Sequence, residues 1–145
     1  MMISTRGRYA MRIMIELATN EGKEYMTLRE VSENQGISEK YLESIIKILV
    51  KDGMVFGLRG KGGGYKLAKS PEECTVGSIL KLTEGSLAPV SCLEGDQNGC
   101  DRAGDCVTLP VWKELGDLID NYLESITLAN VVSQTEEIPS SDYMI

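Results

Sequence analysis

The amino-acid sequence predicts a mainly α-helical fold with one small β-hairpin and one long helix near its C-terminal end. Two patterns carry this prediction. Apolar residues recur at spacings of three and four in several segments, as the buried face of a helix requires. Apolar and polar residues alternate around glycines in MVFGLRGKGGGYKLA, residues 54–68. The chain has 145 residues, of which 42% are apolar, so we expect one domain with a packed core.

Two helices are expected in the first 36 residues. Ser4 or Thr5 can cap the first helix, whose apolar positions follow the helical spacing. Thr27 is followed three residues later by Glu30, which is the spacing of a capping box. The helix that begins there is short and ends at Gly36, because glycine tolerates the positive φ of a helix C-terminus.

A third helix is expected from Ser38, its capping residue, to near Gly53. Its predicted inward-facing residues are Tyr41, Leu42, Ile45, Ile46 and Leu49. A short helix, a glycine turn and a longer helix form the helix-turn-helix pattern, which is common in DNA-binding proteins but also resembles other helical hairpins.

The hairpin at residues 54–68 strengthens the DNA-binding interpretation. A phosphate-binding loop is excluded, because no Gly-Lys-Ser/Thr follows the glycines and no helix begins there. An ordinary flexible hairpin is the other interpretation. Arg59 and Lys61 lie at the glycine-rich tip, where they can approach a DNA minor groove and its phosphates. A basic hairpin after a helix-turn-helix predicts a winged helix-turn-helix DNA-binding domain.

A short helix capped by Thr75 and ended by Gly85 is expected next, and a long helix begins around Pro110. The apolar seam of that helix comprises Trp112, Leu115, Ile119, Tyr122 and Ile126. Val111, Leu118 and Leu123 widen it. Two heptad-like repeats leave packing on its own domain open, but we favour a dimerisation helix. The tail from Gln134 is polar and expected to be disordered.

These elements predict four regions. Residues 1–84 form the winged helix-turn-helix domain, residues 85–109 a cysteine-containing loop, residues 110–133 the dimerisation helix region, and residues 134–145 the tail.

The charges are divided unevenly along the chain. Residues 1–70 carry 12 lysines and arginines against 8 acidic residues, whereas residues 71–145 carry 3 against 14. The net charge of −7 therefore hides a basic first half of +4. Because only the basic face has to meet nucleic acid, the acidic total does not exclude DNA as a partner.

Other classes of protein are disfavoured. The start MMISTRGRYAMRIM lacks an apolar run with a cleavage site, and no stretch is long enough to cross a membrane, so we expect a cytoplasmic protein without a membrane partner. The chain has no histidine and no nucleophile-elbow motif, which argues against an enzyme.

Three of the four cysteines lie in SCLEGDQNGCDRAGDC, residues 91–106. Seven residues separate Cys92 from Cys100, and five separate Cys100 from Cys106. Clustered thiols in a reducing compartment favour metal binding over structural disulfides, and thiolates suit iron–sulfur clusters or zinc. Zinc is the weaker candidate, because its structural sites usually have tighter ligand pairs. Cys74 stands alone and is expected to be a small packed side chain.

The order of ISTRGRYAMR, GISEKYLE, RGKGGGYKLA, the spaced cysteines and W…YLESITLANVV resembles one family. It is the family of bacterial winged helix-turn-helix transcriptional regulators that includes IscR, NsrR and CymR, and the resemblance covers residues 2 to about 133. The resemblance implies a homodimer that binds a double-stranded DNA operator as a repressor.

Family members with three loop cysteines hold an iron–sulfur cluster that controls DNA binding. The resemblance therefore implies that Cys92, Cys100 and Cys106 hold a cluster, of which 2Fe–2S is the expected type and 4Fe–4S the other candidate. CymR-like members lack these cysteines and respond through a partner protein, and a regulator of that kind is the alternative function.

The chain departs from the family at the fourth cluster ligand. IscR-like members have a histidine where this chain has Leu109, and some nitric-oxide sensors have an aspartate where this chain has Arg8. Neither residue can ligate iron. Asp101, Asp105 and Glu94 are nearby carboxylates, and a cluster with so weak a fourth ligand is expected to be labile.

The expected DNA-binding residues are Thr5, Arg6, Ser38, Lys40, Tyr41, Glu43, Ser44, Arg59 and Lys61. The helix that Ser38 caps carries four of these residues in its first two turns: Lys40, Tyr41, Glu43 and Ser44. Major-groove contacts are made from these turns. Glu43 can accept a hydrogen bond from a cytosine amino group, and Lys40 can donate to guanine or phosphate.

Overall fold

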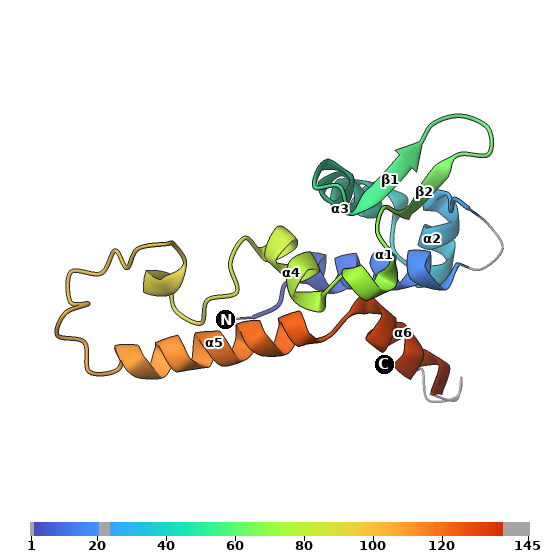
Figure 1. Cartoon of the computed structure of the whole chain (residues 1–145). Coiled ribbons are helices and arrows are strands. Elements are labelled where there is room, and N and C mark those ends of the chain that lie inside the picture. The colour runs from blue at the N-terminus through green and yellow to red at the C-terminus, as the bar shows by residue number, and fades with distance from the viewer. Residues whose placement is uncertain (1, 21–23, 138–145) are drawn as a thin grey trace.

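A computed structural model describes residues 2–20 and 24–137 of the chain. It shows a helical head with a hairpin and a long arm that ends in the cysteine loop (Figure 1). The head contains α1 (Thr5–Thr19), α2 (Leu28–Gln35), α3 (Glu39–Lys51), β1 (Val55–Leu58), β2 (Gly64–Leu67), α4 (Val76–Glu84) and α6 (Leu128–Glu137). The arm contains α5 (Leu109–Ser125), and the short 3-10 turns η1 (Pro71–Glu73) and η2 (Ser91–Leu93) lie in the connections. The expected mainly helical fold with one hairpin is confirmed.

The starts of α1, α2, α3 and α4 lie where the sequence predicts them. The capping side chains are those of Ser4, Thr27, Ser38 and Thr75. Thr27 Oγ1 accepts from the Glu30 backbone N–H at 3.1 Å, and Glu30 Oε2 accepts from the Thr27 N–H at 3.3 Å. This pair is the expected capping box. Gly36 ends α2 with a φ of +66°, in the left-handed region that favours glycine.

The core of the head is built around α1, which contacts α3, α4 and α6. The fully buried apolar side chains include Ala10, Ile13, Met14, Leu42, Ile45, Ile46, Leu49, Ile79 and Leu128. Four of the five residues expected to face inward on α3 are buried, and Tyr41 is half-buried at the edge of the core. Cys74 is 3% exposed, so the prediction of a packed side chain is confirmed.

The hairpin pairs β1 with β2 in antiparallel register, with Val55 opposite Leu67 and Leu58 opposite Gly64. Met26, just before α2, pairs with the other edge of β2. Its N–H donates to the Tyr65 carbonyl at 2.9 Å and its carbonyl accepts from the Tyr65 N–H at 2.7 Å. A side chain at Gly64 would overlap the Met26 carbonyl, so glycine is needed for this close approach. The hairpin is therefore anchored to the helix-turn-helix.

The region 110–133, expected to be one dimerisation helix region, contains parts of two helices, and its role in dimerisation stays a prediction. The α5 helix ends at Ser125, Ile126 is extended, and α6 begins at Leu128. The break is held by two backbone hydrogen bonds, because Val76 N donates to Ile126 O at 2.9 Å and Leu128 N donates to Cys74 O at 2.7 Å. The fully buried Leu128 then places α6 in the head, against α1 and η1.

The α6 helix runs on to Glu137, so residues 134–137 of the expected tail are helical. Residues 138–145 of that tail lie outside the described residues. Across residues 2–20 and 24–137, each helix is too short or too polar to cross a lipid bilayer.

Candidate nucleic-acid interface and cysteine loop

The α3 helix presents a polar surface on the side away from the core. Lys40, Glu43 and Ser44 are exposed in its first two turns, and Ser38 caps it by accepting from the Tyr41 N–H at 3.3 Å. Glu43 Oε1 lies 3.5 Å from Lys47 Nζ, an exposed pair one turn apart. Such pairs are weak in water, so both groups remain available for another partner.

Tyr41 differs from the other candidates on α3, because its ring is held by the head. It lies edge-on to the ring of Tyr9 in α1, with the ring centres 5.5 Å apart, and Arg12 lies over the Tyr9 ring at 5.3 Å. The Ser44 hydroxyl donates to the Tyr41 carbonyl at 2.7 Å. Tyr41 thus joins the start of α3 to α1, which orients the exposed side chains beside it.

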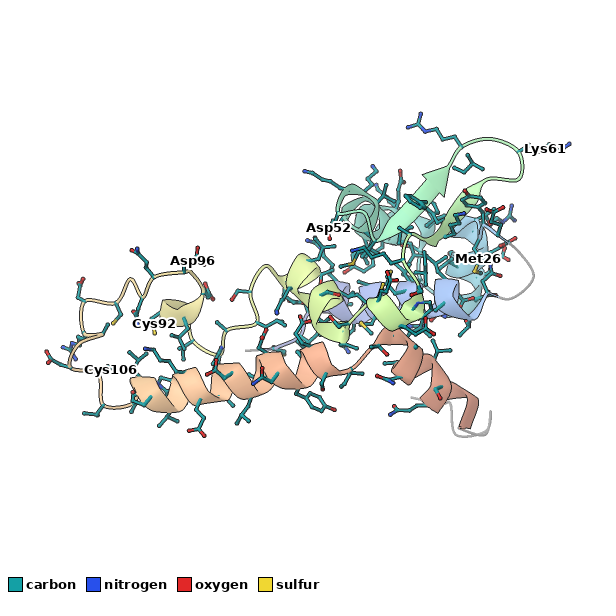
Figure 2. All side chains as sticks on the ribbon, viewed as in Figure 1. Met26, Asp52, Lys61, Cys92, Asp96 and Cys106 are labelled. Atoms are coloured by element: carbon teal, nitrogen blue, oxygen red, sulfur yellow. The ribbon has the colours of Figure 1, made fainter. Side chains whose placement is uncertain are left out.

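The wing lies beside α3. Arg59 and Lys61 are exposed in the tip between β1 and β2, and Lys61 extends outward from it (Figure 2). A groove of about 650 Å³ separates α3 from the wing, and its lining includes Glu43, Lys47 and Arg59. The structure therefore brings a candidate base-reading residue and a candidate minor-groove residue to the same groove.

The start of α1 forms a second part of this surface. Thr5 and Arg6 are exposed and line a hollow of about 420 Å³ that Tyr41 also lines. Thr5 Oγ1 accepts a hydrogen bond from Arg8 Nη2 at 3.1 Å. The nine candidate residues therefore come from three neighbouring elements: the start of α1, the start of α3 and the wing.

The cysteine loop lies at the far end of the arm, away from the wing (Figure 2). Cys92 and Cys106 are half-buried, Cys100 is exposed, and all three are free thiols. In the part of the chain that the structure describes, no three or more cysteines, aspartates and glutamates are grouped closely enough to hold a metal ion. The polypeptide alone therefore does not gather the three thiols.

The chemistry of the donors nevertheless fits a soft metal centre. A hydrogen bond with the Thr108 hydroxyl, 3.4 Å from Cys106 Sγ, lowers the pKa of Cys106 and favours the ligating thiolate. Burial raises the pKa of Cys74, which favours the unreactive thiol. Asn98, two residues before Cys100, has a buried amide nitrogen, Nδ2, without a hydrogen-bond partner among the described residues. The loop therefore also contains a hydrogen-bond donor that the described residues do not satisfy.

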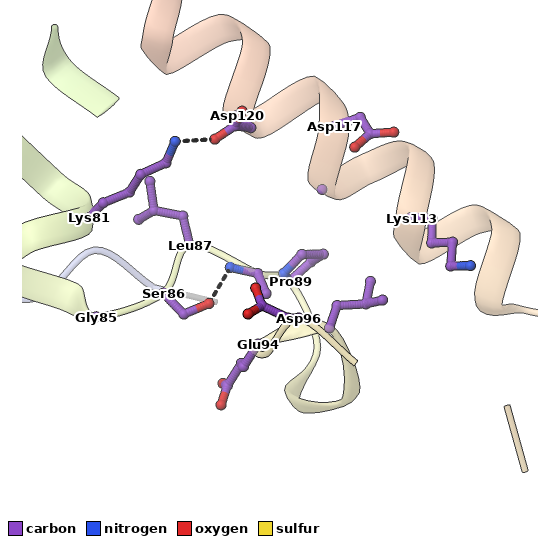
Figure 3. A pocket seen from close by; sticks show the side chains of 13 residues that line it. Lys81, Gly85, Ser86, Leu87, Pro89, Glu94, Asp96, Lys113, Asp117 and Asp120 are labelled. Carbon is purple, nitrogen blue, oxygen red and sulfur yellow. Dashed lines mark hydrogen bonds and ion pairs between the residues drawn. The ribbon is translucent and has the colours of Figure 1, made fainter. Parts of the chain in front are cut away.

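The nearby carboxylates do not converge on the thiols. Glu94 lines a hollow of about 660 Å³ between the loop and α5, together with Asp96, Lys113 and Asp117 (Figure 3). The other two candidate fourth ligands, Asp101 and Asp105, are exposed in the loop. Leu109 is buried as the first residue of α5, and Arg8 is exposed on α1.

Two contacts between distant parts of the chain are not predictable from the sequence. Glu84 accepts hydrogen bonds from Ser4, 80 residues away. Glu124 of α5 accepts from Thr75 Oγ1 at 2.9 Å and from Lys81 Nζ at 2.9 Å, which fastens α5 to α4. No local pattern reveals such pairs, because each depends on how the helices pack.

The head has a helix-turn-helix with an exposed second helix, a basic wing beside that helix, and a basic start of α1. Together these features define a class of protein. This class is the DNA-binding transcriptional regulators of the winged helix-turn-helix type, which are not enzymes. The Rrf2 family, described as "Iron-dependent Transcriptional regulator", matches residues 3–134. The chain belongs to this family.

Individual relatives agree with this assignment. The regulator IscR of Pectobacterium carotovorum is 36% identical over 142 residues, which cover 98% of this chain and 85% of that protein. The structure of T. potens IscR matches with a TM-score of 0.75 and 34% identity, covering 99% of this chain and 97% of that one. The structure of CymR, the global cysteine regulator of B. subtilis, matches with a TM-score of 0.75 and 35% identity, covering 92% and 98%.

Proposed function

We propose that the chain is a cytoplasmic repressor that binds operator DNA as a homodimer, with an iron–sulfur cluster in the cysteine loop controlling its affinity. The observation that supports control by a cluster is that three possible thiolate ligands, Cys92, Cys100 and Cys106, lie in one exposed loop. IscR, a relative of this chain along most of its length, supports the same proposal.

The DNA contacts divide among the three elements of the basic surface. The α3 helix enters the major groove, where Glu43 and Lys40 reach base edges. Arg59 of the wing borders the minor groove, and Lys61 and Arg6 neutralise phosphates. Ser38 and Ser44 use their hydroxyl groups within α3, so their contribution to DNA binding is mainly to shape the helix.

The homodimer forms through the outer face of α5. Its exposed apolar side chains are those of Val111, Leu115, Leu118 and Tyr122, spaced four, three and four residues apart. This spacing forms a stripe suited to a second helix of the same kind. Ile119 and Ile126, which were expected on the apolar seam, instead pack against the head.

The three thiolates would hold the cluster, and the group would supply a response to iron or oxidants when bound. Because the thiols are apart in the described structure, residues 91–108 have to close around it. Closure of the loop at the end of α5 would shift the equilibrium between arrangements of the two heads. If the closed loop favours one arrangement by about 1.4 kcal/mol, the operator affinity changes tenfold. The 2Fe–2S type is proposed and 4Fe–4S is the other candidate, since both types take four ligands and three protein thiolates leave the fourth position to a weak ligand.

A second candidate is control by a partner protein without a cluster. The structural likeness to CymR and the separated thiols in the described loop favour it. The two candidates differ in what the purified protein contains.

The test is anaerobic purification followed by iron and acid-labile sulfide counts and visible spectroscopy. Cluster control predicts a brown protein with iron and sulfide in equal amounts, lost when Cys92, Cys100 or Cys106 is changed to serine. Cys74→Ser is the matched control and should keep the colour. A colourless protein with neither iron nor sulfide, or a triple-serine variant that retains its iron, would contradict the assignment. Zinc without sulfide would indicate a structural metal site instead.

A further inference from the structure

Glu84, the last residue of α4, forms a tether to the start of α1. Its Oε1 accepts hydrogen bonds from the Ser4 N–H at 3.1 Å and from the Ser4 hydroxyl at 2.6 Å. The same Ser4 Oγ accepts from the Gly7 N–H at 3.0 Å and so caps α1. One hydroxyl therefore caps α1 and connects it to α4.

The negative charge of Glu84 is favourable beside the N-terminus of α1. The first turn of α1 has no acidic residue and carries Arg6, with Arg8 following. A negative charge near the N-terminus of a helix is favourable because of the helix dipole, and hydrogen bonds to a carboxylate are stronger than those between neutral groups. Glu84 thus supplies, from a distant part of the chain, the acidic group that the first turn of α1 lacks.

The packing at Gly7 shows how closely the two elements meet. A Cβ at Gly7 would overlap Glu84 Oε1 and lie 3.3 Å from Leu80 Cδ2. Gly7 is buried although it lies in the first turn of a helix. Glycine in a helix is unfavourable by itself, so its presence here is explained by the space that the Glu84 carboxylate occupies.

The tether lies beside two parts of the proposed DNA-binding surface, the start of α1 and the start of α3. Ser4, Thr5, Arg6, Tyr41, Thr83 and Glu84 line a single hollow between the ends of α1, α3 and α4. Thr5 and Arg6 directly follow the tethered Ser4, and Tyr41 lies in the first turn of α3. Directly after Glu84 comes Gly85, with a φ of +79°, where the chain leaves the head towards the cysteine loop.

We propose that Glu84 is a positioning residue for DNA binding, which holds the first turn of α1 so that Thr5 and Arg6 face the same DNA backbone as α3. This inference rests on the proposed use of Thr5 and Arg6 as phosphate contacts. Glu84 carries a negative charge, which DNA repels, and its role in fixing Ser4 accounts for its presence on this surface.

The test compares Glu84→Ala, Glu84→Gln and the matched control Glu72→Ala, which removes an exposed glutamate from η1. Affinity is measured by fluorescence anisotropy over a salt titration, with a labelled duplex that the parent protein selects from a random pool. Glu84→Ala should weaken binding about tenfold and lower the salt slope by about one, because one phosphate contact is lost. Glu84→Gln keeps an acceptor for both Ser4 donors and should bind within about twofold of the parent.

Gly7→Ala in the parent chain tests the tether if Glu84→Ala folds poorly. It should weaken DNA binding, because its methyl group displaces the Glu84 carboxylate. Where Glu84→Ala does fold, Gly7→Ala should have less further effect in that variant, because only the Leu80 Cδ2 contact at 3.3 Å remains. Tighter binding by both Glu84 variants would show that the carboxylate only repels phosphate and would overturn the proposal. Unchanged affinity and salt slope in Glu84→Ala would do the same. If the parent selects no DNA sequence, the proposed function itself fails.

Discussion

Replacing Leu118 with alanine should weaken the proposed dimer without unfolding the head. Leu118 lies on the outer face of α5 and is 62% exposed in the single chain. Ile119, the next residue, lies about 100° further round the helix and packs against the cluster of Val76, Leu80 and Leu87. Substitutions at these two adjacent positions therefore test self-association and folding separately.

The size of the effect follows from the exposed fraction of Leu118. Full burial of a leucine side chain contributes about 1.5–3 kcal/mol, so burying the 62% that is exposed contributes about 1–2 kcal/mol. A two-fold dimer contains the residue twice, which doubles the loss to about 2–4 kcal/mol, and the dimer dissociation constant should rise by about 30-fold to several hundred-fold. The lower end is expected, because alanine retains Cβ.

Sedimentation equilibrium over a range of protein concentrations measures this constant. Ile119→Ala is the control, and it should lower the free energy of unfolding by about 2 kcal/mol because it leaves a void against the head. Leu58→Ala removes an equally apolar, half-exposed side chain from the wing and should change neither quantity much. A parent that remains monomeric at high concentration, or an unchanged dissociation constant for Leu118→Ala, would refute the assignment of α5 as the dimer helix.

Three further predictions concern DNA binding and the helix-turn-helix. Glu43→Ala should relax discrimination at one base pair by about 1–3 kcal/mol while non-specific binding holds or improves, and an unchanged base preference in competition assays would contradict base reading. Lys61→Ala should weaken all sequences equally and lower the salt slope by about one, whereas Arg59→Ala should weaken A·T-rich flanks most; parent-like affinity of both over a salt titration would mean that the hairpin is not a wing. Thr27→Ala should lower the free energy of unfolding by about 1 kcal/mol in urea denaturation, and an unchanged midpoint would show that the capping box contributes little.

The local sequence alone determined where most elements begin and end. Capping by Ser4, Thr27, Ser38 and Thr75 and the turn at Gly36 depend on hydrogen bonds within three or four residues, so their residue types identify them. A similar reciprocal pair went unpredicted at α6, where Thr127 and Asn130 hydrogen-bond each other's backbone N–H groups. Its sequence signal, a threonine three residues before an asparagine, is too common to identify a helix start.

Only the tertiary structure decided how the apolar face of α5 is divided. A spacing of three and four residues shows that a helix has an apolar side, but not which of its residues meet the head. The head covers Ile119, Leu123 and Ile126, because α4 is fastened to α5 through Lys81 and Glu124. Leu118 and Tyr122 are left exposed as a consequence.

The cysteine loop shows the same division between sequence and structure. The presence and spacing of Cys92, Cys100 and Cys106 are properties of the sequence and indicate a thiolate site. Their positions in space are decided by the fold, which does not bring the three thiols together into a metal-binding group among the described residues. The tether between Ser4 and Glu84 is wholly a product of the fold, because hydrogen bonds across 80 residues form only once α1 and α4 have packed.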